Sequence, residues 1–182
     1  PDDVSQLLKL PTIGLIGKIE RKGLAEGTAY VVDEPRSPIA EAFRSLRTNL
    51  EFAGVSKPLR TILITSSGPS EGKSTVAINL AMVIAQSGKK VVLVDADLRR
   101  PSIHSKLKLT SGAGLTDMFR SLATDQDASV PWGDNPEIMV IPSGDIPPNP
   151  TELLGSDRMT QILNQLCKKF DIVVIDSPPF IV

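Results

Sequence analysis

Residues 65–75 read TSSGPSEGKST, and this stretch decides the fold because of what stands on either side of it. The apolar run Ile62–Ile64 precedes it and the apolar run Val76–Ala85 follows it, which predicts a strand, a turn and a helix. A glycine-rich turn with Gly-Lys-Ser between a strand and a helix is typical of a phosphate-binding loop. Backbone N–H groups and the positive end of the helix dipole would converge there on an anionic ligand.

The residues of this loop have predicted tasks. Gly72 would let the backbone approach the phosphates, Lys73 would reach the β and γ phosphates, and Ser74 would offer its hydroxyl to Mg²⁺. The predicted nucleotide-binding set is Gly68, Pro69, Ser70, Glu71, Gly72, Lys73, Ser74 and Thr75. The pattern G-x-x-x-x-G-K-[ST] requires glycine at position 67, where this chain has Ser67. A glycine-rich turn with a chance lysine is the alternative, but the flanking strand and helix favour the phosphate loop.

Two later apolar runs end in aspartate. Val91–Val94 leads into Asp95 and Asp97, and Ile172–Ile175 leads into Asp176. The carboxyl ends of parallel strands line the ligand crevice of an α/β sheet, so these carboxylates should gather beside the phosphate loop. They predict a hydrated Mg²⁺ that also takes a hydroxyl and phosphate oxygens. The alternative is that Asp95 and Asp97, which would point to the same side of the strand, only cap the next turn.

Strands and helices alternate along the rest of the chain. A strand is predicted at Ile13–Ile19 and another at Ile138–Ile141, and a capped helix is predicted from Thr151 to about Lys169. This alternation predicts an α/β fold with a doubly wound, mostly parallel sheet and helices on both faces, as in P-loop NTPases. We expect one domain over residues 1–182, with a linker and short strands in 1–36 and a mobile polar loop over 123–135.

Composition limits the possible partners. The formal net charge is -1, so no bulk basic character points to nucleic acid. A single cysteine, Cys167, excludes an internal disulfide and is interpreted as a small buried residue. No apolar run approaches the roughly 20 residues that span a bilayer.

A helix is predicted after Ser37-Pro38, which places serine at the N-cap and proline at the first helical position. Glu41, Arg44 and Arg47 then recur at intervals of three on the side opposite the apolar residues. The simplest interpretation is a solvated face with weak ion pairs. The sharper one is a contact between subunits, in which arginine forks meet carboxylates of a neighbour.

Four segments together resemble one known family. They are the phosphate loop (Walker A), the apolar run with Asp-x-Asp-x-Arg over Val91–Arg99 (Walker A′), the apolar run with Asp-Ser-Pro-Pro over Ile172–Pro179 (Walker B), and Glu41-x-x-Arg44-x-x-Arg47. The chain resembles the bacterial tyrosine kinases (BY-kinases), the cytoplasmic domains of polysaccharide co-polymerases that control capsule and exopolysaccharide export. Walker A′ is the discriminating motif because ordinary P-loop proteins lack it.

The resemblance implies an ATP-dependent protein-tyrosine kinase that uses ATP/ADP and Mg²⁺ at the cytoplasmic face of the bacterial inner membrane. It implies that Lys73 neutralises phosphate, that Asp95 rather than Asp97 takes the proton of the attacking tyrosine, and that Ser74, Asp95, Asp97 and Asp176 hold the metal. Glu41, Arg44 and Arg47 would build a homo-oligomeric ring. The implied partners are a transmembrane activator region or subunit and the polysaccharide export machinery.

The chain also departs from the family pattern. Members continue past Asp-Ser-Pro-Pro through further strands to a C-terminal tyrosine cluster, so we expect a domain that lacks its C-terminal part. The single tyrosine, Tyr30, lies in an apolar patch and is expected to be packed. One alternative function is therefore a nucleotide-switched oligomerisation module. A partition-type ATPase is another, but those proteins carry an extra lysine early in the loop, and Ser66–Pro69 has none.

Overall fold

The computed structural model describes residues 9–19, 27–54, 57–110, 112–121 and 123–180. In these residues one sheet runs in the order β1-β5-β2-β4-β3. The strands are β1 (Thr61–Ile64), β5 (Ile172–Asp176), β2 (Val91–Asp95), β4 (Ile138–Ile141) and β3 (Val130–Pro131). The first four are parallel and β3 pairs antiparallel with β4, so the predicted mostly parallel sheet is confirmed.

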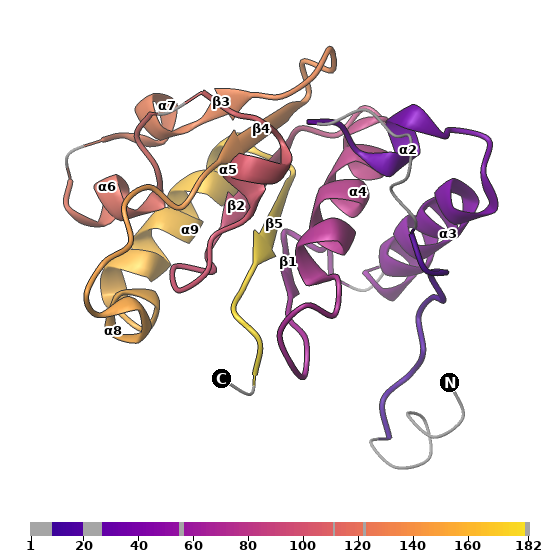
Figure 1. Ribbon diagram of the computed structural model, residues 1–182, viewed down its shortest axis with the longest axis horizontal. Helices are drawn as coiled ribbons and strands as arrows, with labels where there is room; N and C mark the ends of the chain where they lie inside the picture. Colours follow the sequence, from indigo (N-terminus) through magenta and orange to yellow (C-terminus); the bar gives the residue numbers. More distant parts are fainter. Residues whose placement is uncertain (1–8, 20–26, 55–56, 111, 122, 181–182) are drawn as a thin grey trace.

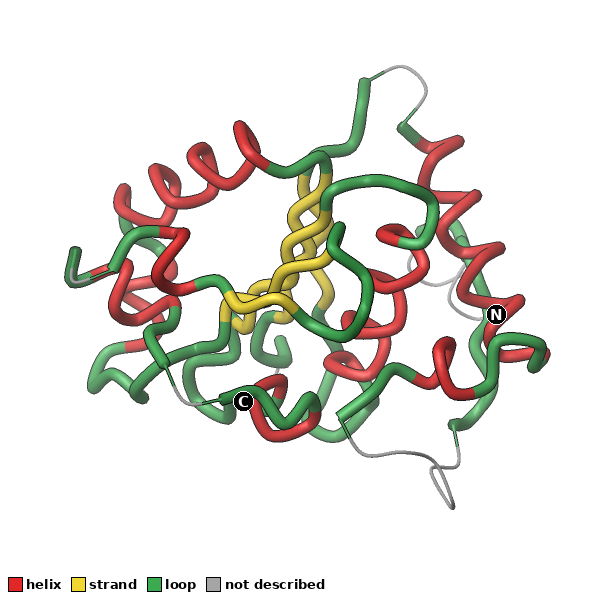
Figure 2. Tube along the Cα trace, turned by 90° about the horizontal axis from the view of Figure 1, so that it is seen from above, coloured by secondary structure: helices red, strands yellow, loops and turns green. Residues whose placement is uncertain are grey.

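Helices cover both faces of this sheet (Figures 1 and 2). On one face lie α2 (Tyr30–Asp33), α3 (Pro38–Ala53) and α4 (Lys73–Ala85). On the other lie α6 (Leu115–Phe119), α8 (Pro150–Leu154) and α9 (Asp157–Lys169). Successive residues of a strand face opposite sides, so Val91 and Leu93 join the core with α4 while Val92 and Val94 join the core with α9. Burial on both faces is why β2 and β5 are apolar without alternation.

The helix α3 begins as predicted. The Ser37 hydroxyl accepts a hydrogen bond from the Ala40 N–H (3.1 Å), and Phe43 and Leu46 are buried against α4. The prediction that Arg47 lies on the solvated side is wrong. One of its Nη atoms donates to the Val83 carbonyl of α4 (3.2 Å), which turns its side chain into the interface between the two helices.

The strand predicted at Ile13–Ile19 is not formed in the described residues 9–19. This segment runs irregularly past α3, where the Asn49 amide donates to the Ile13 carbonyl (2.8 Å) and Gly14 lies against Leu46. Only Ile16 and Ile19 of this segment are partly buried against the core, whereas Ile13 and Leu15 are exposed, and the segment pairs with no strand among the described residues. The apolar patch that contains Tyr30 forms the helix α2 instead, with Tyr30 half-buried. The rest of the predicted N-terminal region, 1–8 and 20–26, lies outside the described residues.

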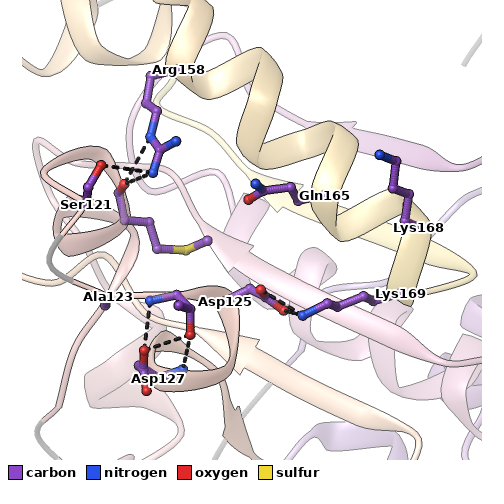
Figure 3. Close-up of a pocket in the computed structure, with 10 residues that line it drawn as sticks. Ser121, Ala123, Asp125, Asp127, Arg158, Gln165, Lys168 and Lys169 are labelled. Atoms are coloured by element: carbon purple, nitrogen blue, oxygen red, sulfur yellow. Dashed lines mark hydrogen bonds and ion pairs between the residues drawn. The ribbon is translucent and has the colours of Figure 1, made fainter.

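The segment predicted as a mobile loop over 123–135 contains structure. It forms α7 (Asp125–Ala128) and then β3. Thr124 caps α7 in a reciprocal arrangement with Asp127. The Asp125 carboxylate accepts from the Lys169 ammonium of α9 (2.6 Å), as Figure 3 shows. The polar residues that suggested a loop are therefore capping groups and ion-pair partners.

A cavity of about 470 Å³ lies between α6, α7 and α9. Figure 3 shows the side chains that line it. Arg158 of α9 donates to the Met118 carbonyl at the end of α6 (3.0 Å) and to the Ser121 hydroxyl (3.2 Å). The charged groups around this cavity hold α6 and α7 onto α9.

The single helix predicted from Thr151 to Lys169 is two helices, α8 and α9, separated at Gly155. Ser156, and not Thr151, caps α9 by accepting from the Met159 N–H (3.4 Å). The Thr151 hydroxyl instead accepts from the Arg99 guanidinium (3.0 Å). None of the helices in the described part of the chain is long and apolar enough to cross a membrane.

Candidate functional site

The loop between β1 and α4 has the backbone of an anion cradle. Gly72 is the N-cap of α4 with φ +93°, and the Val76 N–H donates to the Gly72 carbonyl (2.9 Å) to begin the helix. A Cβ at Gly72 would meet nothing within 4 Å, so the backbone conformation alone requires glycine here. The first N–H groups of α4 are left without helical partners and point toward whatever lies beyond the loop.

The departure at position 67 has a structural explanation. The Ser67 hydroxyl donates to the Glu71 carboxylate (3.1 Å), and the Ser66 hydroxyl donates to the Gly68 carbonyl (2.7 Å). Side-chain hydrogen bonds thus close the turn where the common pattern places a glycine.

This loop is tied to the segment that follows β5. The Thr65 hydroxyl donates to the Pro178 carbonyl (2.9 Å), and the Phe180 N–H donates to the Ser66 carbonyl (2.8 Å). The Ser177 hydroxyl donates to the Ile64 carbonyl (3.1 Å). Hydrogen bonds therefore hold the Walker A and Walker B segments side by side, although they lie more than 100 residues apart in sequence.

A cavity of about 530 Å³ opens at the carboxyl ends of the strands. It is lined by Pro69, Ser70, Gly72, Lys73, Ser74, Thr75, Asp97, Arg99, Arg100, Ser102, Lys106, Pro178 and Pro179. Most of the predicted nucleotide-binding residues are among them. Gly68 and Glu71 belong to the loop but are not among the described residues that line the cavity, and each accepts a hydrogen bond from a serine of the same loop.

Lys73 and Asp97 form an ion pair across this cavity. The Lys73 Nζ lies 2.9 Å from Asp97 Oδ2, and the two side chains are 12% and 4% exposed. Asp97 Oδ1 accepts from the Arg100 N–H (3.1 Å). Both charges are compensated, and both groups border the space that a phosphate would enter.

Asp95 is buried and holds the loop that follows β2. Its Oδ2 accepts from the N–H groups of Ser102 (3.1 Å) and Ile103 (3.0 Å), and its Oδ1 accepts from the Asp97 N–H (3.3 Å). Burial raises the pKa of Asp95 from 3.8 to about 7, although these backbone hydrogen bonds oppose the rise. The contacts of Asp95 thus match the turn-capping alternative, because its carboxylate accepts hydrogen bonds from the backbone of the segment that follows β2. Asp95 is not among the described residues that line the cavity.

Asp176 lies beside Asp95 in the register of β2 and β5 and is fully buried. Neither carboxylate oxygen of Asp176 accepts a hydrogen bond from the part of the chain that the structure describes. Burial raises its pKa, and the nearby Ser74 hydroxyl and Lys73 ammonium oppose the rise only in part. A buried carboxylate without a partner is costly, which points to a cation or ordered water as its missing partner.

The donors present fit a hydrated Mg²⁺ and not a closed metal cage. No group of three acidic, histidine or cysteine side chains that could hold a metal occurs among the described residues. Mg²⁺ keeps several waters and binds phosphate oxygens, so it takes few protein ligands. The Ser74 hydroxyl and the nearby Asp176 carboxylate can supply these ligands.

Sequence reasoning missed three residues that border the cavity, namely Arg100, Ser102 and Lys106. They lie on the segment after β2 that includes α5 (Ile103–Lys106). The signal was available, because ligands of α/β sheets contact the loops that follow the strands. Glu41 and Arg44, by contrast, lie on α3, which is separated from the sheet by α4 (Figure 1). Arg44 is paired there with Glu41.

Comparisons with known proteins agree with this geometry. A family profile described as an AAA domain matches residues 59–182. The tyrosine-protein kinase YwqD of Bacillus subtilis (strain 168) is 44% identical over 148 residues, which cover 81% of this chain and 62% of YwqD. The putative tyrosine-protein kinase CapB of Staphylococcus aureus is 36% identical over 150 residues, which cover 82% of this chain and 65% of CapB. The chain thus spans a little under two thirds of these relatives.

Solved structures give the same result for the fold. The BceF tyrosine kinase domain superposes with a TM-score of 0.88 at 34% identity, covering 100% of this chain and 77% of the solved one. At this similarity the two chains share the same overall fold.

Proposed function

The chain belongs to the bacterial tyrosine-protein kinases, and from that premise we propose that it binds ATP with Mg²⁺ and transfers the γ-phosphate to a tyrosine of a protein acceptor. One observation carries the proposal. Lys73, Ser74 and Asp97 border a single cavity at the N-terminus of α4. Phosphoryl transfer consists mainly of positioning and charge neutralisation, and this cavity offers both.

Within this proposal the phosphates lie against the first N–H groups of α4, with Lys73 at the β and γ phosphates. Ser74 and Asp176 would hold Mg²⁺, directly or through water, with Asp95 and Asp97 as further carboxylates nearby. The ion would neutralise charge that develops on the phosphate oxygens. Lys73 must leave Asp97 to reach the phosphates, so nucleotide binding frees a carboxylate at the moment when a proton acceptor is needed.

Asp97 is better placed than Asp95 to meet the acceptor. Asp97 borders the cavity, whereas both Asp95 oxygens are occupied by backbone N–H groups. In the transfer, the phenolic oxygen forms a bond to the γ-phosphorus, the bond to the ADP oxygen breaks, and the phenolic proton passes to the carboxylate of Asp97. This assignment revises the expectation that Asp95 plays that role.

We extend the proposal to the cellular setting that the family resemblance implies. The domain would work in a homo-oligomeric ring at the cytoplasmic face of the bacterial inner membrane. A transmembrane activator and the export machinery for capsule or exopolysaccharide would be its partners. Glu41 is exposed and Arg44 partly exposed on α3, which supports a contact between subunits there. Arg47 donates a hydrogen bond to the Val83 carbonyl of α4 within the same chain.

The test uses the full-length protein that contains this chain, incubated with ATP and Mg²⁺. Phosphotyrosine should form, and Lys73→Met should abolish it while also removing nucleotide binding in calorimetry. Lys89→Met is the matched control, because Lys89 is an exposed lysine that pairs with Glu51 away from the cavity. Phosphotyrosine that persists in Lys73→Met would refute the kinase assignment.

A second candidate function rests on the tyrosine content. The single tyrosine of the given sequence, Tyr30, is half-buried in α2, which makes it a poor acceptor. In this alternative, ATP sets the oligomeric state of the export machine, with little phosphotransfer. Light scattering of the full-length protein with and without ATP tests it, and an unchanged mass would exclude it.

A further inference from the structure

Ser102 has an unusual hydrogen bond for its position. It is the N-cap of the short helix α5, where a serine hydroxyl usually accepts from an N–H of the first turn. Its hydroxyl makes no such bond and instead donates to the hydroxyl of Ser74 (3.0 Å), 28 residues earlier in the chain. The Ser102 hydroxyl therefore bonds to a residue of the phosphate loop and does not cap α5.

The backbone of the same residue makes a second link. The Ser102 N–H donates to Asp95 Oδ2 (3.1 Å) at the end of β2. One residue thus joins the hydroxyl that we assign to Mg²⁺ and the buried carboxylate beside Asp176. Ser102 is half-buried and borders the cavity in which we propose that the nucleotide binds, without belonging to the phosphate loop.

The direction of the hydrogen bond suits a metal ligand. A serine oxygen has two lone pairs and one proton. When one lone pair of Ser74 accepts from Ser102, the other remains for the cation, and the Ser74 proton is free to point at a carboxylate such as Asp176. Ser74 is 6% exposed, so bulk water offers little replacement for the contact with Ser102. Without it, the hydroxyl can turn among three staggered orientations.

We propose that Ser102 is a positioning residue that holds the Ser74 hydroxyl in the orientation required for Mg²⁺ and couples the loop after β2 to the phosphate loop. The inference rests on the proposed binding of a magnesium nucleotide at this site. It assigns no direct contact between Ser102 and the reacting atoms. The Ser102 side chain does not contact the backbone N–H groups of the phosphate loop that would bind phosphate. Removing its hydroxyl should therefore weaken Mg²⁺ binding and leave the phosphate contacts unchanged.

The experiment measures ADP affinity by calorimetry with excess Mg²⁺ and again with EDTA. Ser102→Ala should weaken ADP binding about tenfold (~1.4 kcal/mol) in Mg²⁺ and leave it unchanged in EDTA. Ser102→Thr keeps the hydroxyl and should restore the Mg²⁺-dependent affinity. Ser105→Ala is the matched control, because Ser105 lies on the same helix and its exposed hydroxyl donates to the Ser102 carbonyl (3.0 Å) and not to the phosphate loop.

Each outcome decides the proposal. An equal loss in Mg²⁺ and in EDTA would mean that Ser102 only supports the fold of the site, and no loss in either would mean that the hydrogen bond is incidental. Thermal unfolding of the nucleotide-free variants checks that Ser102→Ala is folded, and Ser102→Thr gives the answer if it is not. Absence of ADP binding by the wild-type protein would refute the proposed function itself, which is a distinguishable result.

Discussion

Single residues at the strand ends explain most of what this site can do. The two buried aspartates differ in what surrounds them, since Asp95 accepts three backbone hydrogen bonds and Asp176 accepts none from the described residues. Both have raised pKa values because burial disfavours the charged form. Their proximity in the register of β2 and β5 adds to the rise for Asp95.

The raised pKa of Asp95 predicts a pH dependence of folding stability in the metal-free protein. The folded state binds the proton more tightly than the unfolded state, so the stabilising contribution is complete below about pH 4. It is lost as the pH rises through the folded pKa of about 7. Asp95→Asn stays neutral, so its stability relative to wild type should increase between pH 5 and pH 8 by on the order of 2 kcal/mol.

Urea denaturation at the two pH values measures this difference. Asp134→Asn, at an exposed position in the turn between β3 and β4, is the control and should follow the wild-type profile. Parallel profiles for Asp95→Asn and wild type would contradict the prediction.

Whole elements were predicted better than the contacts between them. The strands β2, β4 and β5 and the helix α4 follow directly from continuous apolar runs, because elements buried on all sides leave no ambiguity in the pattern. The short α7, the break at Gly155 and the irregular path of 9–19 could not be read from the sequence. Each depends on a tertiary partner, such as Lys169 for α7, which local periodicity does not reveal.

The same distinction applies to the site. Its phosphate loop and three aspartates were predictable because motif spacing encodes them. Ser102 and Lys106 were missed, because the rule that ligands contact the loops after the strands does not tell which residues of the long segment after β2 reach the cavity. The inward turn of Arg47 likewise needs the neighbouring α4.

A close approach of two backbones at the start of α6 gives a prediction for that element. A Cβ at Gly114 would lie 2.2 Å from the Gly144 nitrogen and 2.6 Å from the Pro142 carbonyl oxygen, and backbone atoms cannot move aside cheaply. Gly114→Ala should therefore lower the free energy of unfolding by about 2 kcal/mol or more.

Gly112→Ala is the matched control, since a Cβ there would meet nothing within 4 Å and the residue has no positive φ. It should be neutral or slightly stabilising. Similar midpoints of thermal unfolding for the two variants would show that the contact between Gly114 and Gly144 is not a constraint.

On the scale of the whole molecule, α3 presents one charged side to solvent and packs its other side on α4. Glu41 is exposed and is paired with the partly exposed Arg44, which also donates to the Pro35 carbonyl (2.7 Å). Exposed pairs of this kind contribute little to folding, so their charges are free to serve an interface.

If the proposed ring uses this surface, Glu41→Lys should reduce the mass of the full-length assembly in light scattering without changing its unfolding midpoint. Glu51→Lys makes the same charge change near the other end of α3 and should leave the assembly intact. Arg47→Ala should act differently and lower stability, because it removes the hydrogen bond to the Val83 carbonyl. An unchanged assembly in Glu41→Lys would remove this face from the ring.

The ion pair between Lys73 and Asp97 also changes how nucleotide affinity should be understood. Asp97 Oδ2 contacts the ammonium, as a phosphate oxygen would, so the carboxylate takes the place of the ligand inside the protein. A nucleotide must displace Asp97 from Lys73 in order to bind, so the measured affinity is lower than the affinity for a Lys73 that has no partner. Replacing Asp97 by an uncharged residue should consequently tighten nucleotide binding in calorimetry while, under the proposed function, phosphotyrosine formation is lost, which would separate recognition of the nucleotide from its use.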